Sequence, residues 1–146
     1  MNRLSVFWVI LSLFWGVGSP LQAGQKQTTE KKFSPGRSFQ TVIVNDQSRQ
    51  YLLYVPMAYD GTSPVPLVFD FHGSGRTPEI QVEYSNFVSL AEKKRFVLAA
   101  PKGLYDNNDK ASWNATQDPN SVDDIKMIRN IIQALAGELA IDKKKI

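Results

Sequence analysis

Residues 65–75 run Val65-Pro66-Leu67-Val68-Phe69-Asp70-Phe71-His72-Gly73-Ser74-Gly75, and this stretch decides the fold that the sequence predicts. Its first half is nearly continuous in apolar residues, interrupted only by Asp70. Such a run, bounded by turn residues, is typical of a strand buried on both faces. Strands of this kind lie inside parallel sheets with helices on both sides. The two glycines that follow allow a sharp turn and leave backbone amides uncovered.

The loop His72-Gly73-Ser74-Gly75 is the first candidate for a site, because ligands of open α/β sheets bind beyond the carboxyl ends of central strands. A dinucleotide site requires G-x-G-x-x-G, but Pro78 stands in place of the third glycine. A P-loop requires Gly-Lys-Ser/Thr, which does not follow. The remaining interpretations are a structural turn and an oxyanion hole, in which preorganised amides stabilise charge on a carbonyl oxygen. We favour the oxyanion hole.

Composition bounds the class of protein. The chain has 146 residues, 42% of them hydrophobic, which suits one globular domain. The formal net charge of +3 is too small to indicate a nucleic-acid partner. The chain has no Cys and a single His, which excludes disulfides, thiolate metal sites, Cys nucleophiles and a His-rich zinc site built from this chain. The sequence therefore implies no cofactor and no metal.

The N-terminus has the layout of a secretory signal peptide. Arg3 provides a positive start, residues 4–18 are apolar, and Ala23 precedes a cleavage point. We therefore expect residues 1–23 to be removed and the protein to be secreted, extracellular or periplasmic. A membrane anchor is the alternative, but the apolar core is shorter than the ~18–20 residues that a span needs. Residues 24–37 are expected to form a flexible lead-in.

Alternating hydrophobic patterns predict the first strands. Residues 39–44 and 49–55 form a hairpin around a polar loop, and 66–71 is the central strand. Thr77 is the expected N-cap of a helix that runs to the charged end at Arg95. The expected apolar positions of this helix are Ile80, Tyr84, Phe87, Val88 and Ala91. The strand at 96–100 completes a βαβ unit whose two strands should be parallel.

The second half begins with a long loop at 104–120, of the kind that is often functional. Residues 121–124 resemble a helix capping box, and Ile146 is expected to open a further strand after a turn at 141–145. The first turn of a helix favours acidic residues, so Asp123 and Asp124 are interpreted as capping groups. The expected apolar positions of this helix are Ile125, Ile128, Ile131, Ile132, Leu135 and Leu139.

An ordered set of motifs resembles the secreted esterase family of polyhydroxybutyrate depolymerases and feruloyl esterases, which are α/β-hydrolases. The resemblance covers the chain from about Arg37 onward. It implies an α/β fold with a mostly parallel sheet, helices on both faces and an incomplete C-terminus. Residues 38–146 would be the N-terminal half of that domain. The matching segments are Arg49–Pro56, Pro66–Gly75, Phe96–Gly103, Ser112–Asn114 and Val122–Ile125.

The resemblance also implies a function, a serine-dependent carboxylic ester hydrolase that acts on polyester or feruloyl-type esters, polymeric substrates included. The family carries its nucleophile in Gly-x-Ser-x-Gly, which does not occur in this sequence. We therefore expect the chain alone to be inactive. Two alternatives stay open. One is a peptidase or acyltransferase on the same fold, and the other is an exported binding protein without catalysis. Neither nucleic acid nor a stable membrane anchor is expected as a partner.

The candidate site residues lie in two loops. The backbone N–H of Ser74 is the first candidate for an oxyanion donor, and that of Gly75 is the second. Gly73 allows the turn, and His72 is expected to support the loop by hydrogen bonds rather than to act as a base. In the long loop, Trp113 and Tyr105 are candidates for an acyl or aromatic subsite, with ordinary loop packing as the alternative.

Overall fold

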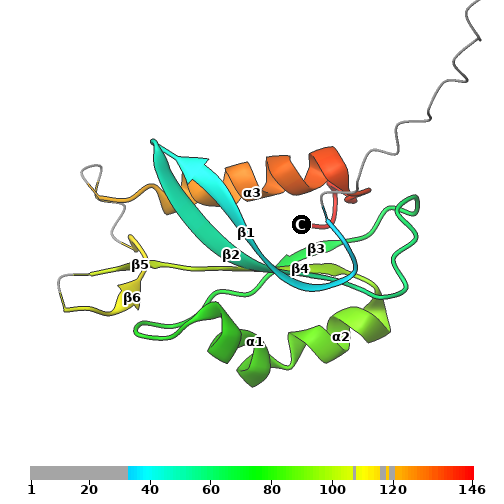
Figure 1. Cartoon of the computed structure of the whole chain (residues 1–146), viewed down its shortest axis with the longest axis horizontal. Helices are drawn as coiled ribbons and strands as arrows, with labels where there is room; N and C mark the ends of the chain where they lie inside the picture. The colour runs from blue at the N-terminus through cyan, green and yellow to red at the C-terminus, as the bar shows by residue number, and fades with distance from the viewer. Residues whose placement is uncertain (1–32, 107, 116–117, 119–120) are drawn as a thin grey trace, which may run out of the picture.

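The computed structural model describes residues 33–106, 108–115, 118 and 121–146 (Figure 1). The predicted signal peptide at 1–23 and most of the lead-in lie outside these residues. Within them, no helix is long and apolar enough to cross a membrane. The elements in chain order are β1 (Gly36–Val44), β2 (Gln47–Val55), β3 (Leu67–Phe69), α1 (Pro78–Ser85), α2 (Phe87–Lys94), β4 (Val97–Pro101), β5 (Leu104–Tyr105), β6 (Ala111–Ser112) and α3 (Asp124–Glu138).

The predicted hairpin is confirmed. β1 and β2 pair antiparallel along their whole length, from Gly36 opposite Val55 to Val44 opposite Gln47. Only Asn45 and Asp46 connect them, with φ angles of 48° and 61°. A two-residue connection with both φ angles positive matches the right-handed twist of the two strands. The connection is therefore shorter than the four-residue loop that the sequence predicts.

The strand order of the main sheet is β1-β2-β4-β3. β3 and β4 pair in parallel, as the βαβ pattern predicts, but β2 pairs with β4 in the antiparallel direction. Among the described strands, this sheet is therefore mixed and largely antiparallel, and the predicted mostly parallel sheet of the α/β-hydrolase type is wrong. One βαβ unit supplies one parallel pair, whereas the hairpin adds an antiparallel pair and joins β4 in the antiparallel sense.

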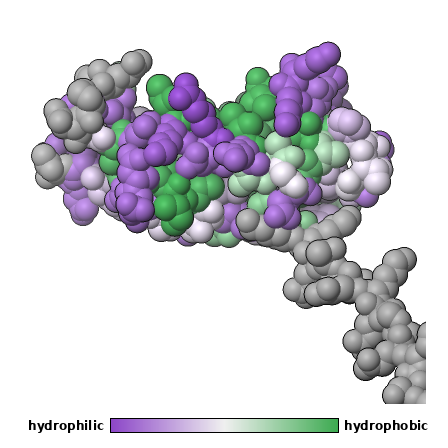
Figure 2. Space-filling model, turned by 90° about the horizontal axis from the view of Figure 1, so that it is seen from above, coloured by the Kyte–Doolittle hydropathy of each residue, from purple (hydrophilic) through white to green (hydrophobic). Residues whose placement is uncertain are grey.

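Helices cover the two faces of this sheet (Figure 1). α3 packs on one face, where Met127, Ile131 and Leu135 are fully buried against strand residues. α1 and α2 cover the other face, where the smaller cluster includes Val82 and Ala91. In the view from the α3 side, hydrophobic patches show between hydrophilic ones (Figure 2). Among the described residues, the hydrophobic cluster that includes the α3 residues has 15 buried members, and the cluster on the α1 and α2 face has 7.

The helical segment after the Gly loop differs from the prediction. Thr77 is the N-cap, as predicted, and its side chain accepts a hydrogen bond from the N–H of Ile80. The single helix expected up to Arg95 is two helices, because Asn86 adopts a left-handed conformation with φ of 57°. The predicted apolar positions are wrong for the first helix, where Ile80 and Tyr84 are 52% and 76% exposed.

The start of α3 separates the two neighbouring acids. Asp123 is the N-cap and accepts a hydrogen bond from the N–H of Lys126 at 2.8 Å, which confirms its capping role. Asp124 is the first helical residue, and its carboxylate has other partners, described below. Ile125 is 52% exposed, so the predicted apolar face begins later in the helix than the sequence pattern indicates.

One edge of β3 is only partly paired. Val65 forms a parallel bridge with Ile141, and the N–H of Leu67 donates to the carbonyl of Lys145 at 3.0 Å. Because backbone groups alternate in direction along a strand, the N–H of Phe69 points to this same side, away from β4. In the described part of the chain it has no hydrogen-bond partner there. The predicted turn before Ile146 is confirmed by a hydrogen bond from Lys145 to Asp142, and Ile146 lies in no described strand.

Candidate functional site

His72 holds the loop that follows β3 through both of its ring nitrogens. Nε2 accepts the backbone N–H of Gly103 at 2.9 Å, so the ring hydrogen lies on Nδ1. Nδ1 then donates to the carbonyl of Gly73 at 2.8 Å. The residue is 2% exposed. With both nitrogens engaged and the ring buried, His72 is placed to support the loop and not to take a proton from a nucleophile.

The backbone N–H groups of the loop differ in whether they donate a hydrogen bond within the protein. The N–H of Gly75 donates to the carbonyl of Ala111 at 2.8 Å, and Gly75 has a φ of 72°, which favours glycine. The N–H of Arg76 donates to the carbonyl of Gly73 and closes the turn. Ser74 is exposed, and its N–H has no hydrogen-bond partner among the described residues. Of the two predicted donors, only Ser74 therefore has an amide available to a ligand.

Trp113 lies against this loop, although it is distant in sequence. Its indole Nε1–H donates to the carbonyl of His72 at 2.8 Å. Its ring centroid lies 4.8 Å from that of His72 and 5.5 Å from that of Phe71, which it meets edge-on. Phe71 is 47% exposed. The apolar run predicts Phe71 as the end of a buried strand and gives no sign that it lies at the site.

Tyr105 lies farther from the loop. It belongs to β5 and pairs with Ala111 of β6. Its side chain is 57% exposed, and the ammonium group of Lys102 lies 5.7 Å from its ring centroid. The short two-stranded ladder therefore connects Tyr105 to the loop through Ala111, the acceptor of the Gly75 N–H. Of the two predicted subsite residues, the structure brings Trp113 to the loop and leaves Tyr105 beside Lys102.

Gly103 is a second residue that sequence reasoning missed. A Cβ atom at this position would lie 2.3 Å from the carbonyl oxygen of Ser112, which no real contact tolerates. The same residue donates its N–H to His72. The close approach of the two backbone segments therefore requires glycine, and it places the donor that fixes the His72 ring. Its position directly after Pro101-Lys102 indicates a turn but not this contact.

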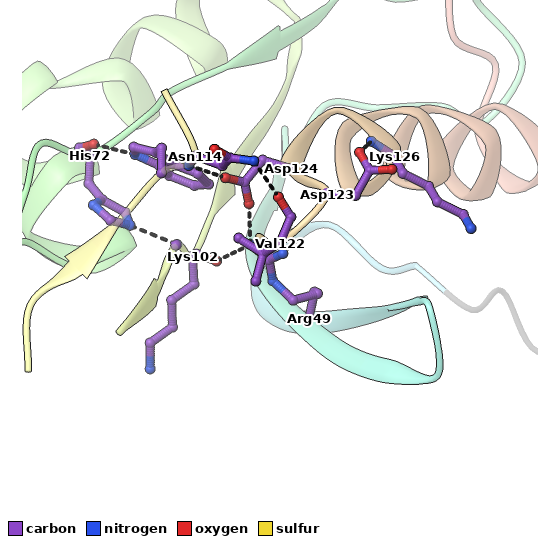
Figure 3. Close-up of polar contacts among 10 residues, drawn as sticks. Arg49, His72, Lys102, Asn114, Val122, Asp123, Asp124 and Lys126 are labelled. Atoms are coloured by element: carbon purple, nitrogen blue, oxygen red, sulfur yellow. Dashed lines mark hydrogen bonds and ion pairs between the residues drawn. The ribbon is translucent and has the colours of Figure 1, made fainter. Parts of the chain in front are cut away.

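An ion pair between the buried Arg49 and the half-buried Asp124 lies beside the loop (Figure 3). Arg49 of β2 is 1% exposed, and its Nη2 donates to Asp124 Oδ1 at 2.6 Å. Asp124 Oδ2 accepts the backbone N–H of Asn114 at 2.8 Å. Asp124 therefore lies in the first helical turn, as expected, but its carboxylate joins β2 to the segment that carries Trp113. Nothing in the sequence pairs Arg49 with Asp124, which are far apart along the chain.

An open cavity of about 340 Å³ adjoins the loop. Aromatic and aliphatic side chains dominate its walls, with polar groups at one side. Such mixed lining is typical of small-molecule sites, in which apolar walls bind and a few polar groups orient the ligand. The lining residues are Phe71, His72, Trp113, Asn114, Asp124, Ile125 and Ile128.

Within the described ranges, no group of three or more His, Cys, Asp or Glu side chains is arranged to hold a metal ion. Neither a scan against protein-family models nor a search of curated proteins finds a match to this chain. Functional assignment therefore depends on the geometry of the His72–Gly75 loop and its neighbours.

Proposed function

We propose that the His72–Gly75 loop stabilises the oxyanion formed on an ester carbonyl, as part of a secreted carboxylic ester hydrolase for polyester or feruloyl-type substrates. The observation that carries this proposal is that some polar groups of the loop are hydrogen-bonded within the protein and one N–H is not. The His72 ring and the Gly75 amide are bonded within the protein, while Ser74 is an exposed residue whose N–H has no hydrogen-bond partner in the described part. A fixed loop with a free N–H is what an oxyanion donor requires.

The surroundings of the loop support an acyl substrate. The cavity beside it is lined by Phe71 and Trp113, which offer apolar surface to an acyl or aromatic group. Preorganised donors gain strength where a bound substrate displaces water from them, because the local dielectric constant is then lower. Supporting hydrogen bonds from His72 and Gly103 remove the need for the loop to reorganise when charge develops on the substrate oxygen.

Under this proposal the attacking group lies outside the residues that the structure describes. Acyl transfer requires an activated nucleophile and a base within hydrogen-bond reach. The only His of the chain is His72, whose two nitrogens are engaged, and the chain has no Cys. Ser74 therefore has no recognisable base. The chain by itself is expected to hydrolyse p-nitrophenyl esters no faster than a buffer control.

The same observation favours a second candidate function, an exported protein that binds its ligand at the loop without catalysis. Both candidates place the ligand oxygen on the Ser74 amide, and they differ only in whether another chain or segment supplies the nucleophile. Esterase activity that depends on an added partner, and on the Ser74 amide, separates the hydrolase from the binding protein.

The Ser74 donor is tested by titrating the ¹⁵N-labelled chain with butylphosphonate, whose tetrahedral anion resembles the reaction intermediate. We expect a saturable shift of the Ser74 amide resonance in the wild type. Ser74→Ala should keep binding, because the backbone N–H remains. Ser74→Pro should lose it, because proline has no N–H.

Circular dichroism must show that Ser74→Pro keeps its fold. Butanol, which carries no charge, is the ligand control and should leave the Ser74 resonance in place. Loss of binding in Ser74→Ala would assign the role to the hydroxyl group instead. A saturable shift confined to residues outside 72–75 would contradict the proposed site.

A further inference from the structure

A chain of polar contacts connects β2 to the His72–Gly75 loop (Figure 3). Arg49 donates to one oxygen of Asp124, and the other oxygen accepts the N–H of Asn114. The next residue back along the chain, Trp113, donates its indole N–H to the carbonyl of His72. Two contacts, from Arg49 to Asp124 and from Asp124 to Asn114, therefore precede the contact that reaches the loop.

We propose that Arg49 and Asp124 are positioning residues for the loop, and that they act through Asn114 and Trp113. The relevance of this role to ligand binding rests on the proposed function. The two carboxylate oxygens of Asp124 have different partners, so the direction of the carboxylate is fixed on both sides. Fixing the Asn114 amide fixes the backbone at Trp113, and with it the height of the indole against His72.

The ion pair is arranged poorly for stability alone. Arg49 is 1% exposed, and its Nε and Nη1 atoms are buried without a hydrogen-bond partner. A buried pair that leaves donors unsatisfied often contributes nothing compared with apolar side chains of similar volume. Its value therefore lies in geometry, because apolar side chains cannot present an oxygen to Asn114. This distinction separates positioning from mere structural support.

Two double variants separate the roles. Arg49→Met with Asp124→Asn keeps a side-chain oxygen for the Asn114 N–H, whereas Arg49→Met with Asp124→Leu removes it. Neither leaves an uncompensated buried charge. Arg37→Met is the matched control, because Arg37 forms an exposed ion pair with Glu83 at 2.8 Å, away from the loop.

The measurement is hydrogen exchange of the Asn114 amide and the Trp113 indole N–H in the ¹⁵N-labelled chain. With the Asp124→Leu pair we expect exchange roughly fivefold to tenfold faster, the factor that one lost hydrogen bond implies. Butylphosphonate affinity should fall with it. With the Asp124→Asn pair, and with Arg37→Met, both quantities should stay near those of the wild type.

Unchanged exchange in a folded Asp124→Leu pair would overturn the positioning role. Faster exchange in that pair, together with a wild type that does not bind butylphosphonate, would keep the positioning role and reject the proposed function. If the Asp124→Leu pair does not fold, Trp113→Phe tests the last contact, because it removes the indole N–H donor and keeps a smaller aromatic ring at this position. Unchanged exchange of the Gly103 N–H in that variant would then overturn the proposal.

Discussion

The two faces of the main sheet are joined to their helices by different forces. On one face, α3 buries Met127, Ile131 and Leu135 completely. On the other face, α1 is joined to the sheet by Asp70, a buried carboxylate that follows β3. It accepts hydrogen bonds from Gln81 Nε2 at 2.8 Å and Ser85 Oγ at 2.6 Å.

α2 shows the same reliance on a carboxylate. Glu92 accepts the Tyr54 hydroxyl at 2.5 Å and the N–H of Met57 at 2.7 Å. The apolar cluster on this face is correspondingly small, with Val82 and Ala91 as its buried helical members. Apolar contact therefore holds α3 on its face of the sheet, whereas hydrogen bonds to carboxylates orient α1 and α2 on the other face.

Of the changes that test this comparison, truncating Ile131 to alanine should lower the free energy of unfolding most. Ile131 of α3 is fully buried, and such truncations cost about 2–5 kcal/mol through lost burial and the remaining cavity. Val82→Ala on the opposite face removes less apolar volume and should cost about 1–2 kcal/mol. Urea denaturation of both variants measures the difference. Ile43→Ala, at a residue 60% exposed, is the control, and equal costs at 131 and 82 would contradict the comparison.

Removing Asp70 should have an intermediate effect. Asp70→Ala leaves Gln81 and Ser85 without their acceptor, and an unsatisfied buried polar group costs about 1–3 kcal/mol. Ser85→Ala removes one of the two bonds and should cost about 1 kcal/mol. The double variant should cost less than the sum of the two single variants, because they share one contact. Additive costs in thermal unfolding would show that Asp70 and Ser85 are not coupled.

The pH dependence of Glu92 should be the smallest effect. The hydrogen bond from Tyr54, followed by that from the Met57 N–H, lowers the pKa of Glu92 below its ordinary value. A lowered folded-state pKa stabilises the protein above the ordinary pKa, and this stabilisation is lost as pH falls through the folded value. The melting temperature should therefore fall less steeply below pH 5 in Glu92→Gln than in the wild type. Parallel curves would exclude this contribution.

The same contrast explains which elements the sequence predicts. The apolar spacing in α3 predicts its buried residues at 131 and 135, because burial alone sets that orientation. The spacing in α1 fails at Ile80 and Tyr84, which are exposed. There, Gln81 and Ser85 turn toward Asp70, and a polar contact across elements leaves no periodic signal in the sequence. Strand direction in the sheet was missed for a related reason, since pairing between β2 and β4 joins segments distant in sequence.

Local sequence patterns predict only some features of the candidate site. Two glycines after an apolar strand predict the loop and its uncovered amide at Ser74. They do not predict that Gly75 donates to Ala111, or that Gly103 approaches Ser112 too closely for any side chain. The Arg49–Asp124 pair was likewise missed, because an acid in a first helical turn is already explained by capping. Contacts between distant segments decide these features, and no single stretch contains them.

The half-paired edge of β3 has a consequence for colloidal behaviour. The N–H of Phe69 points away from β4, two residues before the half-exposed Phe71. An exposed strand edge is a template for the backbone of another molecule. The net charge of +3 supplies little repulsion between molecules to oppose such pairing. An uncovered edge here would therefore favour pairing between molecules at high concentration.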